Sequence, residues 1–145
     1  MSENYTPKST GLPPEIQGYI RAFLRTYPIL KEMADMHLAS GMGINTDGQP
    51  HGTGTSDPTA LSAEKRERIL DDIRIIEESL DIASTDNRSG WVSDFYKRGL
   101  MQKYTEGRRW NQVDGYEYAG ERTWGEKRDR LFREIARRKG LAVND

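Results

Sequence analysis

The sequence predicts an all-α protein, with an N-terminal helical hairpin followed by a C-terminal helix-turn-helix-like unit. Apolar residues recur in several stretches at spacings of three and four, as on one face of a helix, and no stretch alternates with a period of two for long enough to form a strand. Only 34% of the 145 residues are apolar and 31% are charged, with a mean hydropathy of -0.86. The core must therefore come from apolar stripes on amphipathic helices.

The first helix is predicted over residues 14–39, after a flexible leader at 1–13. Pro13 and Pro14 mark its start, because proline suits the first helical position. Between Ile16 and His37 the apolar positions alternate at four and three, which is the seam of a helix packed along another helix. Pro28 interrupts this series, so a kinked helix or two end-to-end helices are expected. The seam could form a homodimer through residues 16–37 or pack against residues 61–80.

A second long helix is predicted over residues 59–83, after a Gly- and Thr-rich loop at 40–57. Ser56 or Asp57 can cap its first free N–H groups, and Pro58 suits its first turn. Its apolar stripe runs from Leu61 to Leu80, with charged residues around it. Two amphipathic helices joined by a loop predict an antiparallel hairpin, so residues 14–87 are expected to form an acidic helical hairpin.

The basic segment is predicted over residues 88–145. A turn cluster at 84–90 precedes an apolar face that includes Trp91, Phe95, Tyr96, Leu100, Met101 and Tyr104. The stretch 108–141 then predicts a short helix, a turn and a longer basic helix closed by Gly140. Such an order is typical of a helix-turn-helix DNA reader.

Charge is divided unequally between the two halves of the chain. Residues 1–87 carry 8 Lys and Arg against 14 Asp and Glu, whereas residues 88–145 carry 14 against 9. This asymmetry suggests that the basic half meets a polyanion and that the acidic half does something else. The alternative is that both halves simply carry ordinary solvated helix faces.

No pattern of catalytic residues is present, so we expect no enzyme, no metal site and no cofactor. The absence of cysteine excludes disulfides and thiol chemistry. His37 and His51 pair with no nucleophile or metal-ligand motif. The carboxylate pairs Asp71-Asp72 and Glu77-Glu78 sit inside a charged helix and are interpreted as a solvated face. No apolar run approaches the roughly 20 residues of a membrane span, so an intracellular protein without a membrane partner is expected.

The basic helix carries the main functional prediction. Trp124, Leu131 and Ile135 would lie on one side of it, while Arg122, Arg130, Arg133 and Arg137 would lie on the opposite side. Such a helix fits the major groove, where guanidinium groups neutralise phosphates and N-terminal side chains reach bases. The predicted base-reading residues are Arg122, Thr123, Glu126, Lys127 and Arg130, and the predicted phosphate-binding residues are Arg108, Arg109, Arg133, Arg137, Arg138 and Lys139. The alternative is a surface helix with Glu126–Arg130 and Arg130–Glu134 ion pairs.

A family resemblance supports this interpretation. The motif residues are Trp110, the pair Arg122-Thr123, and the endings Ile135-Ala136 and Gly140-Leu141. This layout resembles the C-terminal helix-turn-helix, similar to sigma-factor region 4, of phage transcriptional regulators of the RinA/ArpU type. The N-terminal half is similar through Tyr27-Pro28, Ser56-Asp57-Pro58-Thr59 and residues 76–80, so that the resemblance covers residues 16–141.

The resemblance implies a sequence-specific regulator that activates phage late genes in the bacterial cytoplasm. Its partners would be double-stranded DNA and RNA polymerase. The chain departs from the pattern at Asp114, Gly115 and Glu117, where the family has apolar residues, and Gly120 replaces a side-chain cap. Either Tyr116 and Tyr118 take over the packing or the first helix of the motif is absent. The alternative function is a helical oligomeric adaptor, such as a small terminase-like DNA-packaging subunit.

Overall fold

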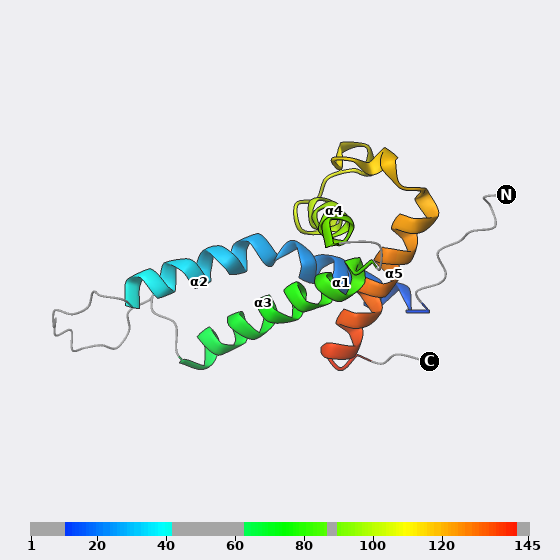
Figure 1. Ribbon diagram of the computed structural model, residues 1–145. Coiled ribbons are helices and arrows are strands. Elements are labelled where there is room, and N and C mark those ends of the chain that lie inside the picture. Colours follow the sequence, from blue (N-terminus) through cyan, green and yellow to red (C-terminus); the bar gives the residue numbers. More distant parts are fainter. Residues whose placement is uncertain (1–10, 42–62, 87–89, 142–145) are drawn as a thin grey trace, which may run out of the picture.

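The protein is all-α in the parts that the computed structural model describes, which are residues 11–41, 63–86 and 90–141. These ranges contain no strand. Figure 1 shows a long hairpin of two helices, with the remaining helices gathered at one of its ends. The helices are α1 (Pro14–Arg25), α2 (Tyr27–Gly41), α3 (Ala63–Ser84), α4 (Gly90–Leu100) and α5 (Glu121–Arg138), with short π and 3-10 turns η5 (Met101–Thr105), η6 (Trp110–Gln112) and η7 (Tyr116–Tyr118).

The predicted first helix is two helices that meet end to end. α1 begins at Pro14, as predicted, and ends where Thr26 donates its hydroxyl to the carbonyl of Phe23 at 2.6 Å. α2 then starts with Pro28 in its first turn, where no intrahelical N–H is needed. Ile20 and Phe23 of the predicted seam are buried inside the molecule. The seam therefore packs within the chain at these positions, and they cannot support a homodimer.

α2 and α3 form the antiparallel hairpin that the sequence predicts (Figure 1). Ile69, Ile73, Ile76 and Leu80 of α3 are buried, in agreement with the predicted stripe. At the end of the hairpin next to α1, the Tyr27 hydroxyl donates to Glu77 Oε2 at 2.7 Å. The predicted loop at 40–57 and the predicted cap at Ser56 or Asp57 lie almost entirely outside the described residues.

α4 continues directly into the wider π turn η5. Tyr96, Leu100 and Tyr104 are buried, as the predicted apolar face requires. Trp91 is an exception, because its side chain is 73% exposed. It stands one residue after the start of α4, at the edge of the molecule, so the prediction that it joins the buried face is wrong.

The predicted first helix of the helix-turn-helix is not an α-helix. Residues 110–118 form the two 3-10 turns η6 and η7, separated by Gly115 with a φ of 78°. The buried Gln102 accepts the Asp114 amide N–H at 2.7 Å and donates to the Asp114 carboxylate at 3.0 Å. This pair of hydrogen bonds holds Asp114 in a non-helical turn. Tyr116 packs against the core, whereas Tyr118 is exposed.

α5 is the predicted long basic helix. It begins after Gly120, which offers no side-chain cap, and it ends at a left-handed Gly140 with a φ of 71°. The amides of Gly140 and Leu141 donate to the carbonyls of Arg137 and Ala136 at 3.1 and 2.8 Å. These two bonds form a Schellman motif, in which glycine is favoured because it adopts positive φ without strain.

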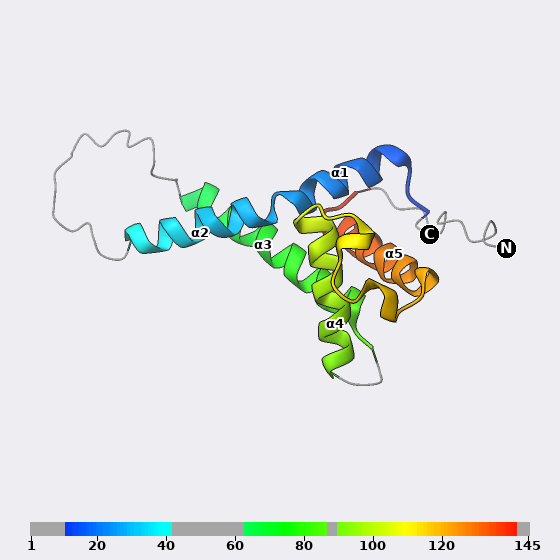
Figure 2. The ribbon, with the colours of Figure 1, turned by 90° about the horizontal axis from the view of Figure 1, so that it is seen from above.

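One hydrophobic core joins the two halves of the chain. α5 packs against α3 and α1 at the end of the hairpin, as Figures 1 and 2 show. Buried residues from both halves belong to a single cluster, with Ile76 and Leu80 on one side and Trp124, Leu131 and Phe132 on the other. The acidic hairpin and the basic segment are therefore packed as one unit in the described structure.

Candidate nucleic-acid interface

The outer face of α5 presents a row of arginines. Arg122, Arg130, Arg133 and Arg137 are all exposed, and Glu126 lies among them. Their spacings of three, four and eight residues place them on one side of an α-helix. The prediction that these arginines lie opposite the apolar face is confirmed, because Trp124, Leu131 and Ile135 are buried.

Trp124 fixes the N-terminal half of α5 in the fold. Its side chain is fully buried and its ring contacts those of Phe95, Tyr96, Trp110 and Tyr116 at centroid distances of 5.2 to 6.0 Å. Its indole N–H also donates to the Tyr116 carbonyl at 3.0 Å. The backbone that carries Arg122 and Glu126 is thereby held rigidly against the core, as an inserting helix requires.

Lys127 does not lie on the outer face, so its predicted base-reading role is wrong. Only 8% of it is exposed, and its ammonium lies 3.2 Å from the Thr85 carbonyl and 3.9 Å from the Asp86 carboxylate. The same ammonium stands 4.6 Å above the Tyr96 ring. Position 127 follows Trp124 by three residues and precedes Leu131 by four, which is the spacing of the buried face. The sequence alone therefore contained the signal that Lys127 faces the core.

The cations at the end of α5 bind carboxylates within the molecule. Arg138 pairs with Glu78 of α3 and with Glu134 of its own helix. The Lys139 ammonium lies 3.4 Å from Asp72 of α3 and 4.6 Å above the Phe23 ring. Both residues were predicted to hold phosphates, but in this structure they attach α5 to α3 and α1.

The pKa values at this contact reflect the ion pairs. Partial burial of Glu134 acts to raise its carboxyl pKa, but the hydrogen bonds from Arg138 and Arg137 outweigh it, and the pKa lies below its ordinary value. Hydrogen bonds to Glu134 and Glu78 raise the pKa of the Arg138 guanidinium. Both shifts favour the charged forms. The shift of Arg138 strengthens its pair with Glu78 of α3, whereas Glu134 is paired within α5.

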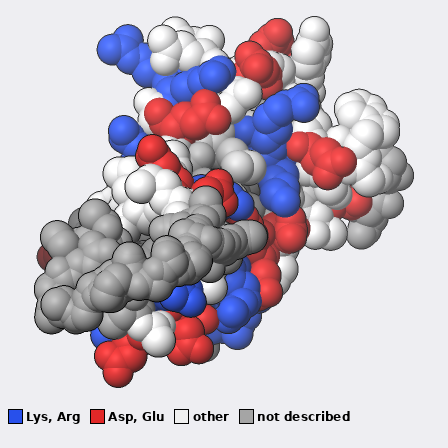
Figure 3. Space-filling view, turned by 90° about the vertical axis from the view of Figure 1, so that its left-hand side faces the viewer, with Lys and Arg blue, Asp and Glu red and all other residues white. Residues whose placement is uncertain are grey.

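The paired carboxylates of α3 are not simply a solvated face. Asp72 and Glu78 reach α5, and Glu77 accepts from Tyr27 and lies 3.7 Å from Lys31 of α2. Only Asp71 pairs within its own helix, with Arg74 at 2.8 Å. The charge asymmetry between the two halves therefore serves in part to hold them together. On the face in Figure 3, Lys and Arg side chains accordingly lie beside Asp and Glu side chains.

The remaining predicted phosphate-binding residues lie in two places. Arg108 is on the loop after η5, with its Nε 3.1 Å from Glu106 and its Nη1 3.3 Å from the Gln112 carbonyl. Arg109 is exposed beside it. Arg137 is on α5 and pairs with Glu134. Arg133 is also on α5, and its guanidinium approaches Gly11.

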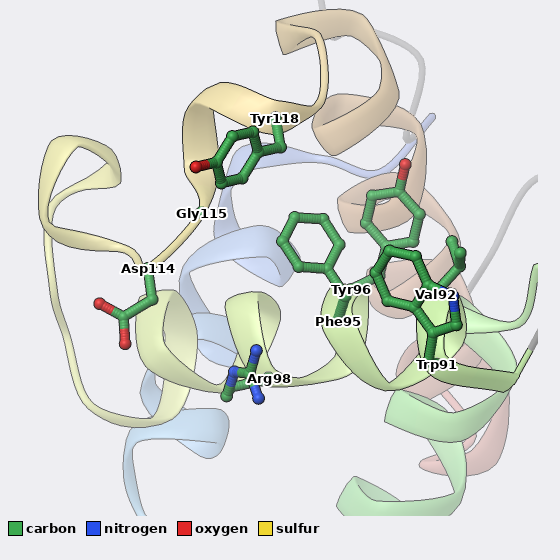
Figure 4. A pocket seen from close by; sticks show the side chains of 8 residues that line it. All are labelled: Trp91, Val92, Phe95, Tyr96, Arg98, Asp114, Gly115 and Tyr118. Atoms are coloured by element: carbon green, nitrogen blue, oxygen red, sulfur yellow. The ribbon is translucent and has the colours of Figure 1, made fainter.

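An apolar hollow of about 570 Å³ lies between α4 and the turn at residues 114–118 (Figure 4). Phe95 and Tyr118 line its apolar surface, while Arg98 and Asp114 contribute charge, and Figure 4 shows Asp114 and Trp91 on opposite sides. Its lining residues include no Ser, Thr, Cys, Lys or His. Its apolar surface can take up an apolar group from a partner.

Within the described ranges, no group of three His, Cys, Asp or Glu side chains is arranged to hold a metal ion. None of the described helices is long and apolar enough to span a membrane. His51 and the side chain of His37 lie outside the described parts of the structure.

Comparison with known proteins identifies no relative. No family model matches the sequence, and no curated protein or solved structure is significantly similar to it.

Proposed function

We propose that the protein binds double-stranded DNA through the outer face of α5 and acts as a sequence-specific transcriptional regulator. The single observation that supports this function is the row of four exposed arginines on a helix whose opposite face is fixed in the core. Guanidinium groups suit this role because they neutralise phosphates and bind guanine edges in bidentate fashion. The sequence resemblance favours a phage late-gene activator that also contacts RNA polymerase.

The structure narrows the residues that would perform this function. Arg122, Thr123, Glu126 and Arg130 remain candidates for base contacts, since three of them are exposed and Thr123 is half-buried. Arg109, Arg133 and Arg137 remain candidates for phosphate contacts. Lys127, Arg138 and Lys139 are removed from the interface, because their largely buried side chains bind partners outside α5, at Thr85, Glu78 and Asp72.

The test is a salt titration of binding to a duplex selected from a random pool and to a scrambled duplex, followed by fluorescence anisotropy. We expect Arg122→Ala to lower the preference for the selected duplex by about 1–3 kcal/mol. Arg133→Ala should weaken both duplexes equally and reduce the salt slope by about 1. Arg138→Ala should leave the salt slope unchanged, because this side chain is paired internally.

The matched control is Arg66→Ala, which removes an exposed arginine from α3. If Arg122→Ala and Arg133→Ala bind both duplexes as the control does, the outer face of α5 is not the interface and the proposal fails.

The second candidate is a helical oligomeric adaptor, such as a small terminase-like DNA-packaging subunit. It is favoured by the exposed Trp91 and Tyr118 at the hollow of Figure 4, since exposed aromatic side chains are enriched at protein interfaces. In the same titration an adaptor would show no preference between the two duplexes at any salt concentration, because phosphate contacts carry no sequence information.

A further inference from the structure

We infer that a pocket between α1 and η5 binds a phosphate group through Arg21, Arg25, Lys103 and Arg108. The pocket is a hollow of about 190 Å³ lined by these four residues together with Tyr104 and Gly107. Two of the cations come from one face of α1, one comes from η5 and one comes from the loop that follows it. No carboxylate lines the pocket.

The positive charge of this pocket is largely uncompensated. Within the described ranges, no Asp or Glu carboxylate forms an ion pair with Arg21, Arg25 or Lys103. Arg108 differs, because its guanidinium lies 3.1 Å from Glu106 and 4.0 Å from Asp114. Two of these cations contact aromatic rings instead of carboxylates. The Arg21 guanidinium lies 5.4 Å from the Phe132 ring centre, and the Lys103 ammonium lies 5.4 Å from that of Trp110. An aromatic face holds a cation in position without neutralising it.

Like charges gathered in this way repel one another, and a bound anion would relieve that repulsion. Partial burial lowers the pKa of the Lys103 ammonium, and the nearby Arg21 lowers it further. Both effects work against the charged form of Lys103 and would be offset by a dianion beside it. Chloride can offset them only in part, because it carries one charge and lacks the separate oxygen atoms that pair with a guanidinium fork in bidentate fashion.

The backbone of the pocket is specialised to bring the cations together. Gly107 has a φ of 79°, and a β-carbon at this position would lie 2.7 Å from the Arg25 guanidinium carbon. The side chain of Arg25 therefore lies directly on the bare Cα of Gly107. Just before it, the π turn η5 closes with the Glu106 amide donating to the Met101 carbonyl at 3.1 Å. Such wide turns inside helices occur frequently at functional sites.

The pocket volume of about 190 Å³ is smaller than the roughly 300–1,000 Å³ of pockets that enclose drug-sized ligands. The pocket therefore has room for a single phosphate group. The rest of the ligand would remain outside. Two sources share this chemistry, a backbone phosphate of DNA and the phosphate of a small molecule. The inference does not rest on the proposed function, because Arg21 packs on Phe132 of the buried side of α5 and not on its outer face.

The test is a titration of the full chain with inorganic phosphate at constant ionic strength, followed by the NMR shifts of the Lys103 and Gly107 amides. We expect saturable shifts in the wild type and an affinity at least about tenfold lower in Arg25→Gln, which loses a charge-assisted hydrogen bond. Lys103→Gln should act in the same direction. Arg66→Gln, which removes an exposed arginine of α3 outside this pocket, should bind phosphate as the wild type does.

Unchanged phosphate affinity in both Arg25→Gln and Lys103→Gln, or the absence of saturation in the wild type, would overturn the inference. Folding of each variant is checked by circular dichroism, and Arg25→Lys keeps the charge while it removes the guanidinium fork. Duplex binding distinguishes the two sources. A DNA phosphate predicts weaker duplex binding by Arg25→Gln, whereas a small-molecule phosphate predicts no change, and both outcomes support the pocket. If neither the wild type nor any variant binds duplex DNA while the wild type still binds phosphate, only the proposed function is rejected.

Discussion

Gly99 of α4 packs against the Trp124 ring of α5. A β-carbon at position 99 would lie 2.4 Å from the Trp124 ring, which is far inside van der Waals contact. The ring cannot move away, because it is enclosed by four other aromatic side chains. Glycine at this position therefore permits the packing that orients the start of α5.

We predict that Gly99→Ala lowers the free energy of unfolding by about 1–3 kcal/mol, because the added methyl group overpacks the contact. Urea titration followed by circular dichroism measures this change. The matched control is Gly18→Ala in α1, where no atom lies within 4 Å of the added carbon. Removing a flexible glycine from a helix should raise stability there by about 0.5–1 kcal/mol. A Gly99→Ala variant as stable as the control would contradict this account of the contact.

At the scale of elements, the contact between α3 and α5 combines apolar packing with ion pairs. Glu78 and Glu134 both bind Arg138, and Asp72 binds Lys139. Glu134 is the least exposed carboxylate of this set. It binds Arg138 within α5, and Arg138 in turn reaches Glu78 of α3.

We predict that Glu134 makes stability depend on pH in the acidic range. Its folded pKa lies below the value in the unfolded chain, so its contribution is present above about pH 4.3, the ordinary glutamate pKa. This contribution is lost as the pH falls through the lower folded pKa. The measurement is the urea midpoint of the wild type and of Glu134→Gln across this range. The gap between them should close as the pH falls, and a gap that stays constant with pH would refute the assignment.

The starts and ends of several helices, and the buried face of α5, could be predicted from residues close together in the sequence. Pro14 and Pro28 mark helix starts, Gly140 marks the end of α5, and the spacing of Trp124, Leu131 and Ile135 identifies its buried face. These features depend on residues close together in the chain, so they can be read without a fold.

Features that depend on distant residues could not be predicted in the same way. The turn at Asp114 requires the buried Gln102, and the pairing of Arg138 requires Glu78, which lies 60 residues away. The phosphate pocket joins α1 to η5 and shows no sequence motif. Lys127 was missed for another reason. Its positive charge led to its prediction as a DNA-contacting residue, although its spacing from Trp124 and Leu131 places it on the buried face of the helix.

At the scale of the whole molecule, both halves share one core. Ile76 of α3 lies in the same buried cluster as Trp124 and Phe132 of α5. All three tryptophans belong to the basic half, so their fluorescence reports on that half alone. Because the two halves share this core, they should unfold together.

We predict that tryptophan fluorescence and circular dichroism give coincident urea transitions, as two-state unfolding requires. Ile76→Ala should shift both transitions equally and cost about 2–5 kcal/mol, because it leaves a cavity in the shared core. Leu70→Ala, at an exposed position of the same helix, should have a small effect. A fluorescence transition that does not move in Ile76→Ala would show that the basic half is stable without the hairpin.

The ion pairs between α3 and α5 also have a kinetic consequence. The chain has a formal net charge of -1, and several cations of its basic half are already bound to its own carboxylates. Long-range attraction depends on the potential that the whole charge distribution creates around the molecule, and a net charge near zero keeps that potential weak at a distance. A polyanion would therefore gain little from distant attraction, and productive collisions would depend on the orientation in which the molecule arrives. For this protein, selectivity would be exercised after first contact, in how long a complex lasts.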